Sequence, residues 1–226
     1  MKNVVRGSVV CLALLLIVNL SALAASKNGV STSKDGSRTI ASKPVTQAVP
    51  SQKKMPAGLT ILYDNASTYP LGVYWCCEGY TISGTASLVG AQFADAMPFT
   101  PSVNATVTHI GVAVGYVAGT NEVAVSLNAD SGGLPGNSLG SFNASNLGTF
   151  GDCCQVEVSS ITGVPVTAGT QYWVVVQTTS PSSDTWAAWN DNDTNQTLQP
   201  FAFNDGGTWT ATEGVLGAFG VAGTTN

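Results

Sequence analysis

The sequence predicts an all-β domain, a two-sheet antiparallel sandwich of jelly-roll type. Apolar residues alternate with small or polar ones in short runs such as 110–115 and 123–128, which is the pattern of a strand with one face in a core. Turn-forming residues recur about every ten positions between such runs. After residue 56 no stretch has the apolar periodicity of a three-turn helix.

Two segments precede this domain. Residues 1–24 combine a basic start, an apolar run and the cleavage pattern Ala22-Leu23-Ala24, which predicts a signal peptide. We therefore expect a secreted or extracellular protein, with the cell surface or the periplasm as alternatives and no membrane span after signal removal. Residues 25–56 are rich in Ser, Thr, Lys and Pro without periodicity, which predicts a disordered basic linker. Residues 57–226 form the acidic β-sandwich domain.

Within the domain, short apolar and β-branched runs predict about ten strands. In chain order they cover residues 59–64, 88–93, 110–115, 123–128, 155–159, 172–176, 185–189, 200–203, 208–212 and 218–222. The turn at 118–121 predicts that the third and fourth of them form an antiparallel pair. In the fragment at 172–176 both the odd and the even positions are apolar, so we expect a strand that is covered on both faces.

The charges are segregated along the chain. Residues 25–54 carry six basic side chains and one acidic one, a formal charge of +5. Residues 55–226 carry twelve acidic side chains and no lysine or arginine, a formal charge of −12. A surface without basic residues cannot neutralise phosphates, so nucleic acid is excluded as a partner of the domain. A hard cation such as calcium becomes more plausible as a ligand.

Several phrases of the domain occur in an order known from secreted bacterial proteins. They are VSLNADSGGLPGNSLG (125–140), VTAGTQYWVVV (166–176), AAW (187–189), GTW (207–209) and GAFGVAGT (217–224). With LYDN (62–65) and AQF (91–93), they resemble the bacterial choice-of-anchor domains. The resemblance covers nearly all of 59–224 and implies a secreted β-sandwich with no established catalytic activity. Family members usually continue into an anchoring segment; the sequence ends at Asn226 without an apolar span, which favours a released protein.

Four cysteines occur as two adjacent pairs, Cys76-Cys77 and Cys153-Cys154. In an oxidising compartment an even number of cysteines favours disulfides. Neighbouring Cα atoms lie about 3.8 Å apart, below the usual disulfide range, so a bridge within a pair is strained. A bridge between the pairs closes a loop of about 76 residues, which the chain-entropy model credits with about 4.5 kcal/mol. We therefore predict that the doublets staple the start of the domain to its middle.

Two ligand-binding candidates lie close together near residue 190. Trp186 and Trp189 are three positions apart, so on a strand they point to opposite faces and one of them could stack on a sugar. Asp191, Asp193 and Asn195 alternate like the opening of a calcium loop, although the EF-hand pattern then fails at Gln196. These three residues are candidate calcium ligands, with a polar surface turn as the alternative.

No residue is assigned a catalytic role. The GNSLG run at 136–140 matches a nucleophile-elbow pattern, but no helix pattern follows, and the only histidine, His109, precedes Ser138, so we expect a turn. Among twelve acids no spacing selects the carboxylate pair that a glycosidase needs. The sequence thus predicts a non-catalytic surface, matrix or binding module whose partner is a glycan or a cell-surface or matrix component. A secreted glycan-active enzyme is the alternative, and the oligomeric state is left open.

Overall fold

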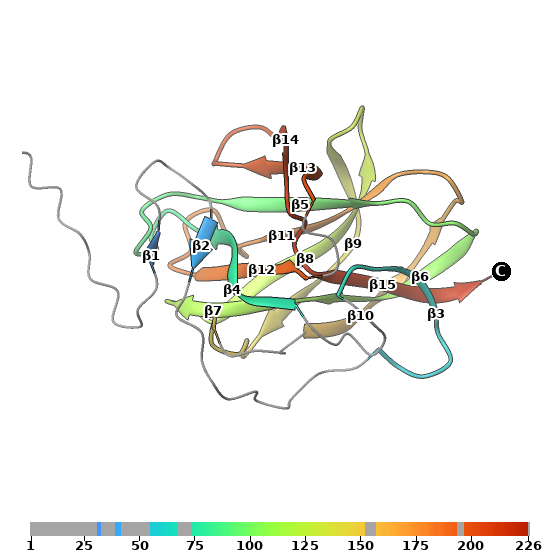
Figure 1. Cartoon of the computed structure of the whole chain (residues 1–226), viewed down its shortest axis with the longest axis horizontal. Helices are drawn as coiled ribbons and strands as arrows, with labels where there is room; N and C mark the ends of the chain where they lie inside the picture. The colour runs from blue at the N-terminus through green and yellow to red at the C-terminus, as the bar shows by residue number, and fades with distance from the viewer. Residues whose placement is uncertain are drawn as a thin grey trace, which may run out of the picture.

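The computed structural model describes residues 31–32, 39–41, 55–66, 74–151, 157–193 and 197–225, with the side chains of 31–32, 75–77 and 157 outside that description. The described residues form fifteen β-strands and no helix, which confirms the all-β class (Figure 1). The named strands all pair antiparallel. Consistent with this, the described chain contains no helix that is long and apolar enough to cross a membrane.

The strands form three sheets. The six-stranded sheet has the order β14 (Thr210–Gly214), β13 (Gln199–Asn204), β5 (Ala94–Phe99), β11 (Tyr172–Gln177), β8 (Glu122–Asp130) and β9 (Pro135–Ser145). The five-stranded sheet has the order β1 (Ser31–Thr32), β2 (Thr39–Ala41), β4 (Tyr74–Ser83), β12 (Trp186–Asn192) and β7 (Val114–Ala118). The four-stranded sheet has the order β10 (Glu157–Val166), β6 (Ala105–Val112), β15 (Phe219–Thr225) and β3 (Thr60–Asp64).

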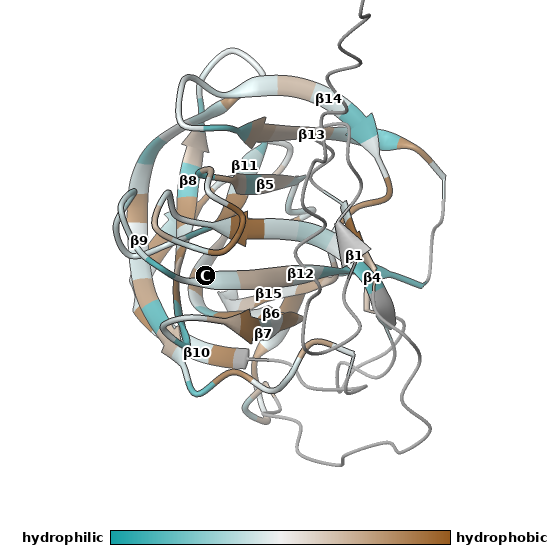
Figure 2. Cartoon of the chain, turned by 90° about the vertical axis from the view of Figure 1, so that its left-hand side faces the viewer, coloured by the Kyte–Doolittle hydropathy of each residue, from teal (hydrophilic) through white to brown (hydrophobic). Residues whose placement is uncertain are grey.

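Backbone hydrogen bonds join the two smaller sheets at Ala113, the residue between β6 and β7. Ala113 donates its N–H to the carbonyl oxygen of Ala218 (3.0 Å) and accepts from the N–H of Asn190 (2.8 Å), while Ala218 N–H donates to Asn190 O (2.7 Å). The strands of these two sheets lie below β5, β11 and β13 in Figure 2. Three sheets therefore replace the two that the sequence predicts, and two of them are continuous through this junction.

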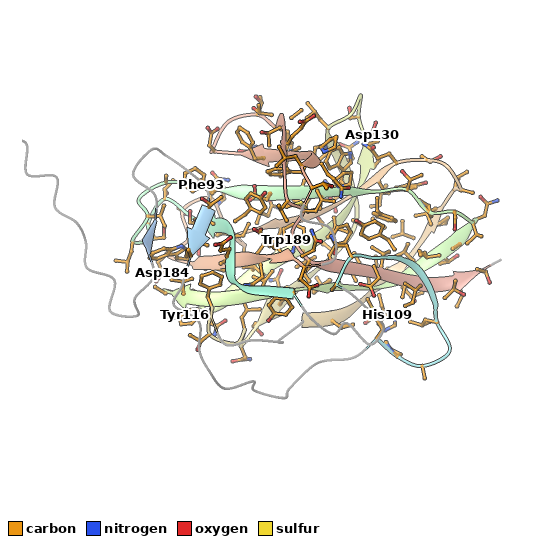
Figure 3. All side chains as sticks on the ribbon, viewed as in Figure 1. Phe93, His109, Tyr116, Asp130, Asp184 and Trp189 are labelled. Atoms are coloured by element: carbon orange, nitrogen blue, oxygen red, sulfur yellow. The ribbon has the colours of Figure 1, made fainter. Side chains whose placement is uncertain are left out.

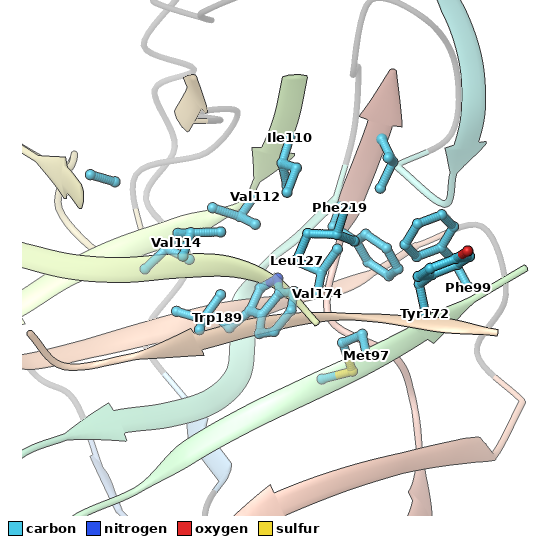
Figure 4. Close-up of a cluster of buried hydrophobic side chains, with 14 of the residues drawn as sticks. Met97, Phe99, Ile110, Val112, Val114, Leu127, Tyr172, Val174, Trp189 and Phe219 are labelled. Carbon is cyan, nitrogen blue, oxygen red and sulfur yellow. The ribbon is translucent and has the colours of Figure 1, made fainter. Parts of the chain in front are cut away.

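The main core lies between the six-stranded sheet and the joined sheets. Met97, Leu127 and Val174 come from the six-stranded sheet, and they belong to the same buried cluster as Ile110 on β6 and Trp189 on β12 (Figure 4). The alternating positions of each strand supply these residues, because successive side chains point to opposite faces. Burial of such side chains provides most of the driving force for folding.

The structure corrects several strand predictions. Residues 84–92 form turns, whereas the strands on either side of them are β4 and β5. The predicted pair across the turn at 118–121 does not form, because β7 pairs with β12 while β8 pairs with β11 and β9. Strand β9 was not predicted at all, and it includes the GNSLG run, which is part of a strand rather than a turn.

Two short strands lie within the range predicted as a disordered linker. β2 pairs with β4 through Thr39–Tyr80, Ile40–Gly79 and Ala41–Glu78, and β1 pairs with β2. Ile40 is only 1% exposed. At these residues the chain adds an edge to the five-stranded sheet, which differs from the expectation of an unstructured tether.

Candidate functional site

The two tryptophans predicted as ligand contacts are both buried. Trp189 is 0% exposed in the main core, where its Nε1–H donates to the carbonyl oxygen of Ala218 at 2.9 Å. Trp186 is 6% exposed and belongs to a separate cluster with Ile40 and Phe150. The two rings do lie on opposite faces of β12, as the spacing predicts, but neither offers a face to a ligand. The structure therefore corrects the assignment of Trp186 and Trp189 as ligand contacts.

A different pair of tryptophans lies on the outer face of the six-stranded sheet. Trp173 alternates with the core residues Tyr172 and Val174 on β11, so it points away from the main core. It is 2% exposed and forms a small cluster with Val175, and Trp209, the residue before β14, packs against that cluster. Trp209 is the one tryptophan with a described side chain that is only partly buried.

Asp130 fixes the polar edge of this outer cluster. Its Oδ1 accepts hydrogen bonds from Trp173 Nε1 (2.8 Å) and Gln171 Nε2 (2.9 Å), and its Oδ2 accepts from the N–H of Gly133 (3.1 Å). Desolvation by its neighbours acts to raise the pKa of Asp130, but the hydrogen bonds outweigh it and hold the pKa below its usual value. The carboxylate is therefore ionised at neutral pH. Asp130 lies at the periphery of the molecule in Figure 3, in contrast to the central Trp189.

Further polar groups continue along the same face of β8. Ser126 Oγ donates to Asn128 Oδ1 (2.7 Å), and Asn128 Nδ2 donates to the carbonyl oxygen of Gly136 (2.7 Å). These hydrogen bonds hold the two side chains, both of them buried, in one geometry. Together, Trp209, Asp130, Gln171 and this polar row form what we term the outer tryptophan face.

A second candidate site contains carboxyl groups between the sheets. Asp191 lies on the same face of β12 as Trp189, and Asp95 lies on the same face of β5 as Met97, so both point towards the main core. Tyr80, on β4, donates its hydroxyl to the carbonyl oxygen of Val215 at 2.6 Å. Burial raises the pKa of Tyr80 above its ordinary value, and the charges of Asp191 and Asp95 add to the shift.

Asp191 lies in an environment that disfavours its charged form. Burial, with a smaller contribution from the nearby negative charge of Glu78, raises the pKa of Asp191 to about 7. Its Oδ1 atom, like Oδ1 of Asp193, is inaccessible to solvent and has no hydrogen-bond partner among the described residues. Asp191 therefore keeps its proton to a higher pH than an ordinary aspartate does, beside the exposed side chain of Glu78.

The calcium prediction rests partly on these residues. Asp191 and Asp193 are described, whereas Asn195 lies outside the described residues. In the part of the chain that the structure describes, no group of three or more acidic, histidine or cysteine side chains is arranged to hold a metal ion. Calcium binding at this loop stays a prediction.

The first cysteine doublet lies in an irregular stretch of β4 beside Asp191. Trp75 pairs with Asp191 and Gly79 with Asn190, so residues 76–78 are additional on the β4 side. Such a bulge bends the strand and re-aims its side chains. The side chains of Cys76 and Cys77 are not described, and Cys153 and Cys154 lie outside the described residues, so the predicted staple stays a prediction.

The remaining motif residues show no catalytic arrangement. Ser138, on β9, is exposed, and its Oγ donates a 3.5 Å hydrogen bond to the carbonyl oxygen of Gly140. His109, on β6, contacts Thr108 Oγ1 through Nδ1 at 3.0 Å. The outer tryptophan face was missed because sequence spacing cannot say which tryptophan is covered; the turn residues before Trp209, Asp205-Gly206-Gly207, were the only available signal.

Comparisons with known proteins add no assignment. No model of a known protein family matches the chain, and no curated protein matches it in sequence.

Proposed function

We propose that this protein is an exported, non-catalytic β-sandwich that acts as a surface, matrix or binding module and binds carbohydrate at the outer tryptophan face. The observation that carries the proposal is the position of Trp209, a partly exposed indole that packs on the cluster whose member Trp173 donates a hydrogen bond to Asp130. An indole ring presents a flat apolar surface, against which the C–H face of a sugar ring can stack. Asp130 and Gln171 lie where polar groups could meet hydroxyls of the sugar.

The charge of the domain supports a neutral ligand. With a formal charge of −12 and no lysine or arginine after Lys54, the domain offers no cationic group to pair with a phosphate, sulfate or carboxylate of a ligand. A neutral glycan meets no such requirement. The predicted signal peptide and the resemblance to choice-of-anchor domains support export and a role at a surface or in a matrix.

The test is glycan binding by matched variants. The parent protein should bind one or more neutral glycans on an array without releasing product, and Trp209→Ala should weaken that binding at least about tenfold, the loss expected for a central aromatic contact. Trp209→Tyr should retain part of the affinity. Leu88→Ala is the control, because Leu88 is an exposed apolar side chain (78%) beside Val89, which packs on the other layer.

Each variant should also keep the melting temperature of the parent to within a few degrees, because Trp209 lies at the edge of its cluster rather than inside it. Glycan binding that is unchanged in a folded Trp209→Ala variant would place the ligand elsewhere and refute this site.

One observation favours a second candidate function, a secreted glycan-active enzyme. Asp191, with its pKa raised to about 7, lies within electrostatic range of the Glu78 side chain. One raised and one ionised carboxyl group form the acid pair that glycoside hydrolysis requires. The enzyme hypothesis predicts release of reducing ends from a polysaccharide by the parent and loss of that activity in Glu78→Gln and in Asp191→Asn. The binding-module hypothesis predicts no release by any of the three.

A further inference from the structure

Strand β2, with the two-residue strand β1 outside it, joins the rest of the five-stranded sheet through few residue pairs. Three residue pairs join it to β4, from Thr39 opposite Tyr80 to Ala41 opposite Glu78. Thr39 is exposed and Ala41 half-buried, so Ile40 is the one fully buried side chain that β2 supplies. An edge held by so short a strand opens more readily than the interior of the sheet.

Ile40 fills a defined apolar site. It packs in a cluster with Val117 of β7, Phe150, and Trp186 and Ala188 of β12. All four of these residues belong to the domain itself and not to the N-terminal segment that carries β2. When β2 leaves, the cluster loses one wall and the backbone groups of β4 at this edge lose their partners. An open strand edge beside an apolar surface is a template for another strand.

The connection to the domain is long enough for β2 to occupy either its own domain or another. Thirteen residues separate Ala41 from Met55, and a chain of that length can span up to about 48 Å when extended. The contacts made by β2 are the same whether the acceptor edge belongs to its own molecule or to a second one. The choice between them is therefore set by concentration, and it shifts towards exchange when protein is present at about millimolar levels.

Charge complementarity is compatible with either arrangement. The segment that contains β2, residues 25–54, has a formal charge of +5, and the domain has a formal charge of −12. A neighbouring domain thus attracts the segment as its own domain does, whereas two isolated domains repel each other.

From these observations we propose that β2 is a donor strand that is exchanged between two copies of this chain, with Ile40 of one copy seated against Val117, Phe150 and Trp186 of the other. The acceptor is the edge of β4, and the product is a dimer in which each copy completes the five-stranded sheet of its partner. This inference does not depend on the proposed glycan site, which lies on the six-stranded sheet.

The distribution of charged residues provides a direct experiment. Every lysine lies at or before Lys54, and all acidic residues except Asp35 lie at or after Asp64. A carbodiimide, which joins an amine to a carboxylate without a spacer, therefore links the N-terminal segment to the domain. The mature full-length protein, labelled with ¹⁵N, is mixed with unlabelled protein, incubated over a range of concentrations, cross-linked and digested with pepsin, since trypsin has no site in the domain.

Exchange predicts cross-linked peptides in which a heavy N-terminal segment is joined to a light domain, and the reverse. At complete exchange these mixed pairs should approach half of all segment–domain pairs, and they should decrease on dilution below about millimolar concentration. Ile40→Asp should reduce the mixed pairs at least about tenfold, since it places a charge in an apolar site. Ile40→Val is the matched control and should retain them.

Two results would overturn the proposal. One is the presence of same-label pairs alone at every concentration, which would show that β2 remains on its own domain. The other is an equal yield of mixed pairs from the parent and from Ile40→Asp, which would show that charge attraction alone brings the segments together. Circular dichroism of each variant establishes that the sandwich itself is folded.

Discussion

The carboxyl group of Asp191 lies on the core-facing side of β12, where burial and the charge of Glu78 raise its pKa to about 7. In the unfolded chain the pKa is close to 3.8. Between these two values the folded protein holds a proton that the unfolded chain has released. The free energy of unfolding therefore falls as the pH rises from about 4 to about 7, by a total of about 4 kcal/mol.

The amide of Asp191→Asn cannot ionise, so this variant should lose that pH dependence. We expect it to match the parent near pH 4 and to be more stable by a few kcal/mol at pH 8, in urea unfolding followed at both pH values. Glu213→Gln, at an exposed carboxyl group, is the control and should follow the parent throughout. A parent whose stability does not change between pH 4 and pH 8 would show that the Asp191 carboxyl is not destabilising when ionised, as it would be if a bound cation compensated it.

At the scale of elements, the junction of β12 and β15 depends on a close approach to Trp189. Asp191 forms an isolated bridge with Gly217, which precedes β15. A Cβ atom on Gly217 would lie 2.9 Å from Cδ2, Cε2 and Nε1 of Trp189. The indole cannot easily move away, because it is fully buried and its Nε1–H bonds to Ala218 O. The absence of a side chain at residue 217 therefore lets the two joined sheets meet above this ring.

We predict that Gly217→Ala destabilises the protein by about 1–3 kcal/mol, the usual cost of overpacking a core. The measurement is thermal unfolding, in which each kcal/mol lowers the melting temperature by about 2–4 °C for a chain of this size. Gly207→Ala is the control, since its Cβ would meet only Asp205 Oδ1 at 3.9 Å. Equal melting temperatures for the two variants would show that the junction accommodates a methyl group.

The same scale shows why strand partners were mispredicted. Residues 118–121 connect β7 and β8 directly, and a short connection between two strands usually makes a hairpin. Here β7 joins β12 and β8 joins β11, so the connection passes from one sheet to another. The alternation that identifies each strand is local, whereas the strand it pairs with here lies more than forty positions away in the sequence, which no local pattern contains.

At the scale of the whole molecule, the predicted disulfide staple would link two parts of the domain that are far apart in the sequence. If Cys76-Cys77 and Cys153-Cys154 are bridged to each other, non-reducing mass spectrometry of the mature protein should show no free thiol and a link between the two doublets. Reduction should then lower the melting temperature by about 9–18 °C, from a loss of about 4.5 kcal/mol for a loop of this length. Bridges confined to neighbouring cysteines, or a melting temperature unaffected by reduction, would contradict the staple.

The sequence by itself determined the all-β class, the positions of strands such as β3, β8 and β11, and a domain whose charge is acidic throughout. These properties are local, because alternation, turn residues and side-chain charge can be read one segment at a time. Only the tertiary structure decided that Trp186 and Trp189 are covered and that Trp209 remains partly exposed. The exposure of a ring depends on which distant segments pack over it. Ile40 and Phe150 pack with Trp186 from sequence positions more than thirty residues away, and that information is absent from the neighbourhood of any one tryptophan.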